Sequence, residues 1–172
     1  QFSWKKEKYI NLAIFGYQYG EVNHIEHTNK SFVHLRHIRS ITNDYDAEFF
    51  TQIEQNNFTR LVYRGLLGTG MRFSALDSSI RPAFIGIGAF YSEEKIKKVT
   101  GLTDDGVEAI VRANLYFLTK HKFTAQLNNS NAIYYQPQVD DFSDYRALFQ
   151  SKLDFKINEN LKFRLSLDLS HD

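Results

Sequence analysis

The sequence predicts an all-β protein, an antiparallel up-and-down transmembrane β-barrel of about ten strands (roughly 8–12) that forms a single domain over residues 1–172. Three observations predict this fold. Apolar and polar residues alternate with period two along most of the chain, the alternating segments are about 9–13 residues long, and short turns alternate with longer polar loops. Globular strands average nearer about 5–6 residues, whereas tilted strands that cross a bilayer need about 9–11.

The alternation is clearest near the end of the sequence. There the apolar residues Leu161, Phe163, Leu165, Leu167 and Leu169 alternate with Lys162, Arg164, Ser166, Asp168 and Ser170. Residues 45–54, 61–73, 83–91, 109–117 and 145–157 show the same period, residues 9–19, 31–41 and 122–136 show it less regularly, and residues 2–4 resemble the end of a tenth strand. Because Asn129 and Asn131 fall on a nominally apolar face, we expect a β-bulge there that shifts the facing by one residue.

The connections between these segments alternate in length. Short turns are expected at residues 42–44, 75–78, 119–121 and 158–160, and longer loops at 21–30, 95–106 and 137–143, while the connection at 55–57 is shorter than this rule predicts. Outer-membrane barrels place their short turns on the periplasmic side and have an even number of strands. If residues 158–160 are periplasmic, the last segment runs outward, so we expect a further closing strand unless residues 2–4 supply the partner.

The composition excludes several classes of protein. The 21 basic and 20 acidic side chains leave a net charge of +1, which gives no attractive field for nucleic acid. The absence of Cys excludes disulfides, zinc–thiolate sites and thiol nucleophiles. The longest apolar run, Ala83 to Tyr91, is interrupted by Gly86 and Gly88 and is too short for a transmembrane helix, which needs about 20 residues. A mean hydropathy of −0.42 still fits a barrel, because only alternate residues of its strands contact lipid.

Alternation does not say which face of the strands points outward, since a soluble lipocalin-like barrel would enclose its apolar face. We expect the apolar face to contact lipid, because rings lie at or near the segment ends, as in an aromatic girdle: Tyr45, Phe73, Tyr91, Phe117, Phe123, Tyr135 and Tyr145. The opposite face is then a lumen with charges of both signs: Glu48, Glu54, Arg60, Arg64, Arg72, Glu108, Arg112, Arg146, Lys152, Asp154, Arg164 and Asp168. Gly68, Gly70, Gly86 and Gly88 are expected to leave room for the long basic side chains.

Several of these segments resemble one known family. They are Phe32–Arg36, Glu48–Gln52, Asn57–Phe58, Arg64–Phe73, Ala132–Pro137, Asp144–Arg146 and Leu165–Asp172, and the similarity extends from about Leu12 to the end. This is the YdiY-like family, described as salt-induced outer-membrane proteins of unknown function. Its members commonly continue into one more strand that ends in an aromatic residue. The resemblance implies the barrel fold and a bacterial outer-membrane location, and it implies no activity.

No catalytic, cofactor or metal site is predicted. His34 and His37 are three residues apart on a strand and face opposite sides, so they cannot share an ion. His24 and His27 with Glu26 are candidate ligands of a surface metal, and the loop carboxylates Asp104–Asp105 and Asp140, Asp141 and Asp144 are candidate calcium ligands. We interpret both groups as solvated loop residues, and the carboxylates also lack the ligand spacing of a dedicated calcium loop. No Ser–His pair is placed to activate a nucleophile.

We therefore expect a structural or accessory envelope protein with a largely plugged lumen. Its partners are expected to be the lipid bilayer and another outer-membrane or periplasmic protein, and not nucleic acid. The alternatives are a narrow channel or small-ligand carrier, a lipid-modifying enzyme with its site at the rim, and a soluble lipocalin-like binder.

Overall fold

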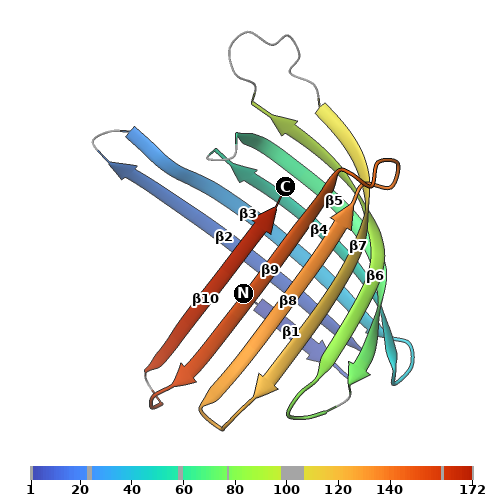
Figure 1. Cartoon of the computed structure of the whole chain (residues 1–172), viewed down its shortest axis with the longest axis vertical. Helices are drawn as coiled ribbons and strands as arrows, with labels where there is room; N and C mark the ends of the chain where they lie inside the picture. Colours follow the sequence, from blue (N-terminus) through green and yellow to red (C-terminus); the bar gives the residue numbers. More distant parts are fainter. Residues whose placement is uncertain are drawn as a thin grey trace. The chain divides into compact units, whose positions relative to one another are not determined.

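The computed structural model describes residues 2–22, 25–57, 60–76, 78–97, 107–159 and 161–171, and it contains ten β-strands (Figure 1). The strands are β1 (Phe2–Lys6), β2 (Tyr9–Val22), β3 (Ile25–Ser40), β4 (Tyr45–Asn56), β5 (Leu61–Leu76), β6 (Ala83–Ile96), β7 (Val107–Lys122), β8 (Leu127–Pro137), β9 (Tyr145–Lys156) and β10 (Lys162–His171). No helix among the described residues is long and apolar enough to span a membrane.

Each strand pairs with its neighbours in the sequence, in the order β1-β2-β3-β4-β5-β6-β7-β8-β9-β10. The pairs are antiparallel, as in the register of Phe2 with Ala13 at one end of the order and of Lys162 with Lys156 at the other. This is the order of an up-and-down β-barrel, and within the described part of the chain no pair joins β1 to β10. The predicted all-β, antiparallel fold of about ten strands is thereby confirmed, with residues 2–6 as the tenth strand.

The chain divides into two compact units, which are described separately below. Unit 1 comprises Gln1–Ile41, Ala47–Thr69 and Ala89–Val111, and unit 2 comprises Thr42–Asp46, Gly70–Gly88 and Arg112–Asp172. Both units take residues from β4, β5, β6 and β7, because the boundary crosses these strands.

Two short turns lie where the sequence predicts them. Residues 41–44 connect β3 to β4, and the Thr42 hydroxyl accepts hydrogen bonds from the backbone N–H groups of Asp44 and Tyr45. Residues 157–161 connect β9 to β10, and the side-chain oxygen of Asn158 accepts a hydrogen bond of 2.8 Å from the backbone N–H of Leu161. Thr and Asn are frequent in turns because their side chains bond the nearby backbone in this way.

The turn predicted at residues 119–121 is wrong. β7 continues to Lys122, with Thr119 paired to Asn131, so Phe117 lies inside the strand rather than at its end. The turn occupies residues 123–126, where the Thr124 hydroxyl accepts hydrogen bonds from two backbone N–H groups. The predicted bulge is wrong too, because β8 keeps an unbroken register with both neighbours. The bulge was predicted in error because Asn129 and Asn131 lie on the apolar face of β8 without any shift of register, so two polar residues interrupt the alternation there.

Other strands are longer than the period predicts. The loop expected at residues 21–30 is mostly strand, since β2 reaches Val22, β3 begins at Ile25, and Gly20 pairs with Thr28 across a register shift. Likewise β5 includes Ala75 and Leu76, so its connection to β6 is residues 77–82. The sequence of residues 28–31, Thr-Asn-Lys-Ser, is polar throughout and Ala75 and Leu76 are both apolar, so neither extension shows an alternation. The loop at 137–143 is present as residues 138–144, whereas most of the one at 95–106 falls outside the described residues.

Glycines of β5 and β6 make room for aromatic rings. A methyl group added at Gly68 would overlap the ring of Phe50 and the Cβ atom of Phe90, and one added at Gly86 would overlap the ring of Tyr116. Phe50 and Phe90 lie edge to face at 6.4 Å, and both are buried. At Gly70 the carbonyl oxygen of Ile87 would lie only 2.7 Å from an added methyl group. The expectation that Gly68, Gly70 and Gly86 accommodate long basic side chains is therefore wrong, because rings and backbone fill this space.

We expect Gly68→Ala to destabilise the fold by about 1–3 kcal/mol, the usual effect of overpacking a filled interior. Gly65→Ala is the matched control, because Gly65 has no atom within 4 Å of the added methyl group. Removing a glycine from a strand should leave this variant unchanged or stabilise it by roughly 0.5–1 kcal/mol. Urea unfolding of the purified proteins measures both changes, and equal stabilities of the two variants would contradict the packing described here.

Charged face and apolar face as the candidate functional site

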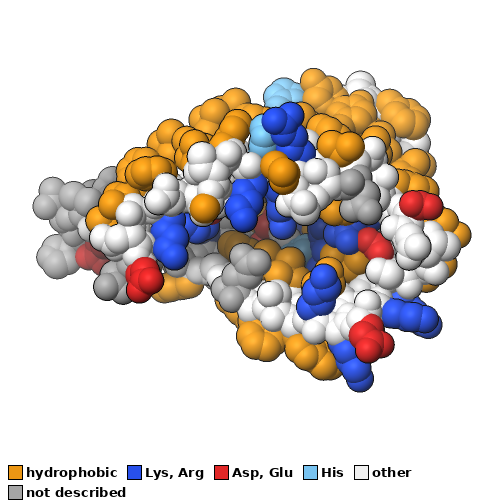
Figure 2. Space-filling view, turned by 90° about the horizontal axis from the view of Figure 1, so that it is seen from below, with side chains coloured by type: hydrophobic (Ala, Val, Ile, Leu, Met, Phe, Trp, Pro, Cys, Tyr) orange, Lys and Arg blue, Asp and Glu red, His pale blue; other side chains and the backbone are white. Residues whose placement is uncertain are grey.

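The described residues bury several charged side chains and expose many large apolar ones, while apolar residues such as Phe50 and Phe90 are buried as well. In unit 1 the side chains of Glu48 and Glu94 are 1% and 2% exposed, and in unit 2 that of Arg112 is 2% exposed. In contrast, Leu67 is 67% exposed and Ile87 is 53% exposed. Figure 2 shows hydrophobic side chains along much of the outline of this view, and Lys and Arg side chains with a few Asp and Glu side chains towards its middle. Charged residues are almost never fully buried in soluble proteins unless they are paired. Below, the side of the strands that carries the buried charged residues is called the charged face, and the side that carries the exposed apolar residues is called the apolar face.

The charged face of unit 1 contains a continuous polar network centred on Arg64 of β5. Its guanidinium donates to Glu54 of β4 at 2.6 Å and to Glu94 of β6 at 2.7 Å. The Gln52 side chain donates to Glu54 at 2.8 Å and lies 3.0 Å from the ring nitrogen Nδ1 of His34 on β3. One cation thus lies between two carboxylates from the strands on either side, and a neutral amide and an imidazole extend the network to a fourth strand.

In unit 2, Arg112 of β7 binds the loop between β8 and β9. Its guanidinium contacts both carboxylate oxygens of Asp144, at 2.9 and 3.0 Å, and also donates to the backbone carbonyls of Gln136 and Asp144. The Gln136 side chain donates to Asn114 of β7 at 3.0 Å. A bidentate pair of this kind fixes both distance and orientation, so it holds the loop against β7.

Three further ion pairs, formed by two carboxylates, lie on the charged face of unit 2. Arg72 donates to Asp46 from Nε at 3.0 Å and also lies over the ring of Phe84, 4.7 Å from its centroid. Asp154 accepts from Arg164 at 2.6 Å and lies 3.0 Å from the Lys162 ammonium. The Arg72 pair is mostly buried, whereas Arg164 on the end strand β10 is 54% exposed.

The predicted lumen residues therefore fall into groups. Glu54, Arg64, Arg72, Arg112, Asp154 and Arg164 take part in the ion pairs described above, Glu48 is buried, Arg146 and Lys152 are half-buried, and Glu108 and Asp168 are exposed. Arg60 does not lie on a strand face. It occupies the turn between β4 and β5 with φ of 60°, and its backbone N–H donates to the carbonyl of Asn57.

The sequence did not identify three acidic partners in these pairs. Glu94 lies beyond Tyr91, where the predicted segment ended, but it continues the alternation of β6. Asp46 is two residues from Glu48 on β4, so the alternation already placed it on the polar face of that strand. Asp144 lies in a loop, so periodicity carries no signal for its contact with Arg112.

The predicted girdle residues lie on the apolar side of their strands or in turns. Tyr135 and Tyr145 have ring centroids 5.5 Å apart, and Tyr145 and His171 are 5.1 Å apart, which forms a row across β8, β9 and β10. Tyr45 pairs with Phe73 at 6.3 Å, and Phe123 stacks on His121 at 4.0 Å in the turn after β7. Tyr91 and Phe117 are exposed on β6 and β7. The prediction omitted Trp4, whose ring contacts Tyr9 at 5.5 Å.

A small polar cluster interrupts the apolar face of unit 2. Asn131 donates to the hydroxyl of Thr119 at 3.2 Å and accepts from Ser151 at 2.8 Å, while Asn129 donates to Ser151 at 3.4 Å. Asn131 also donates to Asn129. These half-buried groups satisfy one another across three strands, which lowers the free-energy cost of polar atoms in apolar surroundings.

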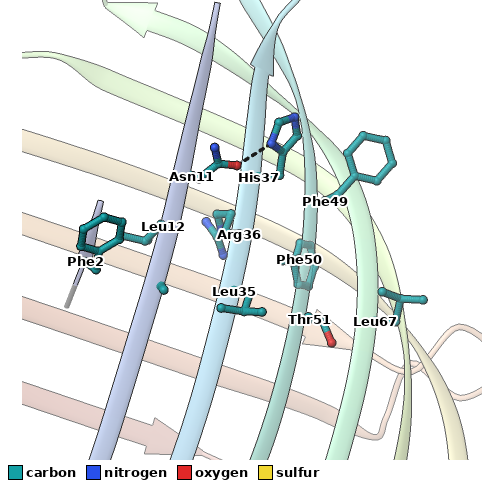
Figure 3. A pocket seen from close by; sticks show the side chains of 11 residues that line it. Phe2, Asn11, Leu12, Leu35, Arg36, His37, Phe49, Phe50, Thr51 and Leu67 are labelled. Atoms are coloured by element: carbon teal, nitrogen blue, oxygen red, sulfur yellow. Dashed lines mark hydrogen bonds between the residues drawn. The ribbon is translucent and has the colours of Figure 1, made fainter. Parts of the chain in front are cut away.

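An apolar groove of about 490 Å³ lies in unit 1 (Figure 3). Phe2, Leu35, Phe49 and Leu67 contribute to its lining, which is almost entirely apolar. The polar side chains at one end are those of Asn11 and His37, which bond to each other at 2.7 Å. The groove can therefore accommodate hydrocarbon, and its lining provides few free polar groups for a polar ligand.

The His, Asp and Glu side chains considered as metal ligands do not form a metal site among the described residues. No group of three or more His, Cys, Asp or Glu side chains that could hold a metal occurs among the described residues. His34 and His37 bond to different partners, Gln52 and Asn11. The side chains of His24, Glu26 and His27, and the pair Asp104–Asp105, lie outside the described residues.

Comparison with known proteins gives one match. A family model described as "Protein of unknown function, DUF481" matches residues 1–172. Neither a curated protein nor a solved structure matches the chain.

We expect Arg64→Met to reduce the free energy of unfolding by about 3–5 kcal/mol, because it leaves the buried Glu94 carboxylate without its cation. Arg164→Met is the matched control. It removes an arginine–carboxylate pair of similar geometry from an exposed position, so its effect should be far smaller. The double variant Arg64→Met with Glu94→Gln should recover part of the loss. Chemical denaturation measures all three, and equal losses for the two single variants would contradict this description of the network.

The loop between β8 and β9 should respond to acid through Asp141. Its carboxylate accepts hydrogen bonds from the hydroxyl and the backbone N–H of Ser143, at 2.6 and 3.0 Å, and these bonds lower the pKa of Asp141 below 3.8. Because the folded loop favours the charged form, the resulting stabilisation is complete above pH 3.8 and is lost as the pH falls through the lowered pKa.

Carboxyl ¹³C NMR measures this titration directly. We expect Ser143→Ala to raise the pKa of Asp141 towards its ordinary value, and Ser143→Thr, which keeps the hydroxyl, to preserve most of the shift. An unchanged pKa in Ser143→Ala would refute the assignment.

Proposed function

The chain belongs to the DUF481 family, and on that premise we propose that it is a small β-barrel protein of the bacterial outer membrane with an ion-paired, largely plugged lumen. This family is the YdiY-like group that the sequence resembles, so that prediction is confirmed. The proposed role is structural or accessory within the envelope, without a catalytic step of its own.

The inverted burial of the two faces carries this proposal. Exposed Leu, Ile and Phe side chains recur along the strands, as at Leu67, Ile87 and Leu165, while Glu48, Glu94 and Arg112 are buried. Transferring one large apolar side chain out of water contributes about 1.5–3 kcal/mol, so a continuous series of them favours hydrocarbon strongly. Strands β2 to β10 have 10–16 residues, long enough to cross a bilayer at a tilt, which needs about 9–11.

The pairing of charges on the opposite face supports a plugged lumen. Arg64, Arg72 and Arg112 are each held by carboxylates within hydrogen-bonding distance, and the rings of Phe50, Phe90 and Tyr116 fill the space above glycines. Interiors of barrels with about eight to ten strands are largely filled by side chains. Fixed ion pairs and packed rings leave little mobile charge for conduction, which favours a structural lumen.

The proposal also includes a partner strand, because the sheet ends in two edge strands. β1 and β10 are the first and last strands of the order, and both faces of β10 are exposed. Hydrocarbon offers no hydrogen bonds, so each free edge of a membrane-spanning sheet needs a strand as its partner. We propose that a further strand, of this protein or of another envelope protein, covers these edges.

Fluorescence quenching by lipids brominated in their acyl chains tests the membrane placement. Trp4 is the only tryptophan, so Trp4→Phe removes the native signal. In that background, Leu165→Trp and Ser166→Trp place a probe on adjacent residues of β10, where Leu165 belongs to the apolar face and Ser166 is opposite Lys152. We expect strong quenching for Leu165→Trp and weak quenching for Ser166→Trp.

The two probes lie at nearly the same depth, so a difference between them reports facing alone. Heat-modifiable gel migration in detergent checks that each variant is folded. Stronger quenching at Ser166→Trp, or a protein that stays monomeric without detergent, would exclude the proposal and favour a soluble barrel with an enclosed apolar face.

A further inference from the structure

A second cavity, which the ion pairs do not fill, lies on unit 2. It has a volume of about 180 Å³, and we name it the basic cavity after Arg72, Lys120 and Lys152, which line it together with Phe84, Ser130 and Gln150. This volume equals that of roughly six water molecules in the liquid. It therefore has room for a small polyatomic ion and part of its hydration shell.

The strand register explains why a cavity forms here. Ser130 of β8 is paired with Lys120 of β7 on one side and with Lys152 of β9 on the other. In the adjacent row of the same face, Ala132 lies between Leu118 and Gln150. The short side chains of β8 are thus flanked by long ones on both sides. Directly opposed side chains have Cβ atoms about 4.5–5.5 Å apart, so two flexible lysines can converge above Ser130.

The two lysines differ from the other cations of this face. Within the described residues, neither the Lys120 nor the Lys152 ammonium has an ion-pair partner. Asp154, two residues from Lys152 on β9, is bound to Arg164 and Lys162, and Asp46 is bound to Arg72. Asp168 is opposite Gln150 on the exposed end strand, diagonal to Lys152. The cavity is therefore lined by two lysines without ion-pair partners in the described part of the chain, and of these Lys120 is exposed and Lys152 is half-buried.

The neutral groups of the cavity suit an oxyanion. The hydroxyl of Ser130 and the side-chain amide of Gln150 have no hydrogen-bond partner among the described residues, and both are half-buried. The apolar side chains of Phe84 and Leu118 form part of the wall, which lowers the local dielectric and strengthens charge-assisted hydrogen bonds. Two ammonium groups, one hydroxyl and one amide provide donors for several oxygens of one tetrahedral ion.

We propose that the basic cavity binds a phosphate group. Lysine binds phosphate as a compact point charge with three donors, and an oxyanion between two unpaired lysines relieves their mutual repulsion. This proposal goes beyond the structural role above and does not depend on it, because the cavity is formed by unit 2 alone. The phosphate group can come from a free solute or from a lipid headgroup.

Isothermal titration of the purified protein in zwitterionic detergent tests this proposal with two probes. Inorganic phosphate represents the free solute, and dihexanoylphosphatidylglycerol represents the headgroup. Binding of either probe supports the cavity, and the stronger one identifies the source. We expect the double variant Lys120→Gln, Lys152→Gln to weaken binding by about tenfold or more, since hydrogen bonds to charged groups contribute at this level.

Lys156→Gln is the matched control, because it removes the same charge from β9 at a position opposite Lys162 and outside the cavity lining. It should leave binding nearly unchanged. Ser130→Asp is a second variant that keeps both lysines and places a carboxylate between them, so it should abolish binding while the strand signal in circular dichroism persists. Absence of binding by the unaltered protein, equal weakening in Lys156→Gln, or undiminished binding in Ser130→Asp would each overturn the proposal.

Discussion

The need to pair charges that are removed from water is the constraint on which the rest of this structure depends. Arg64 meets it with two carboxylates from neighbouring strands, and Arg112 meets it with one carboxylate and two backbone carbonyls. A buried ion pair adds little net stability when it is complete, but breaking it is expensive. The network therefore favours the observed arrangement of strands, in which both ends of each pair are satisfied.

The apolar face follows a complementary rule. Its side chains are exposed in the chain by itself, so whatever surrounds the folded protein must tolerate them. Aromatic rings at strand ends, such as the row formed by Tyr135, Tyr145 and His171, have an apolar body and a polar atom, which suits the boundary between hydrocarbon and water. Where polar side chains do occur among them, as at Asn131 and Ser151, they bond to each other. On both faces, these polar side chains bond to one another across neighbouring strands.

Lys120 and Lys152 differ from the paired arginines, since Lys120 is exposed, Lys152 is half-buried, and neither is in an ion pair with a described residue. They lie on the same face as the paired arginines, and two carboxylates of that face, Asp46 and Asp154, are already engaged by other cations. Ser130 and Ala132 between the long side chains open a space that a closely packed plug would have filled. Lysine ammonium, hydroxyl and amide groups can all donate hydrogen bonds to an anion. The basic cavity has these donors in its lining, whereas the groove of unit 1 is mainly apolar.

Much of this architecture could be predicted from the sequence, because side chains alternate strictly between the two faces of a strand. That rule placed Arg64, Arg112 and Asp154 on the charged face and Leu165 on the apolar face before any contact was known. It could not locate the strand ends near Val22 and Lys122, because polar residues occupy both faces there.

Only the tertiary structure decided which groups meet. Periodicity says nothing about neighbours on other strands, so the bonding of Arg64 to Glu94, the bonding of Arg112 to a loop carboxylate, and the filling of the space at Gly68 by a ring became visible only with the register. The physical reason is that facing is a local property of the backbone, whereas pairing depends on which strands lie side by side and on how far each one is shifted along the next.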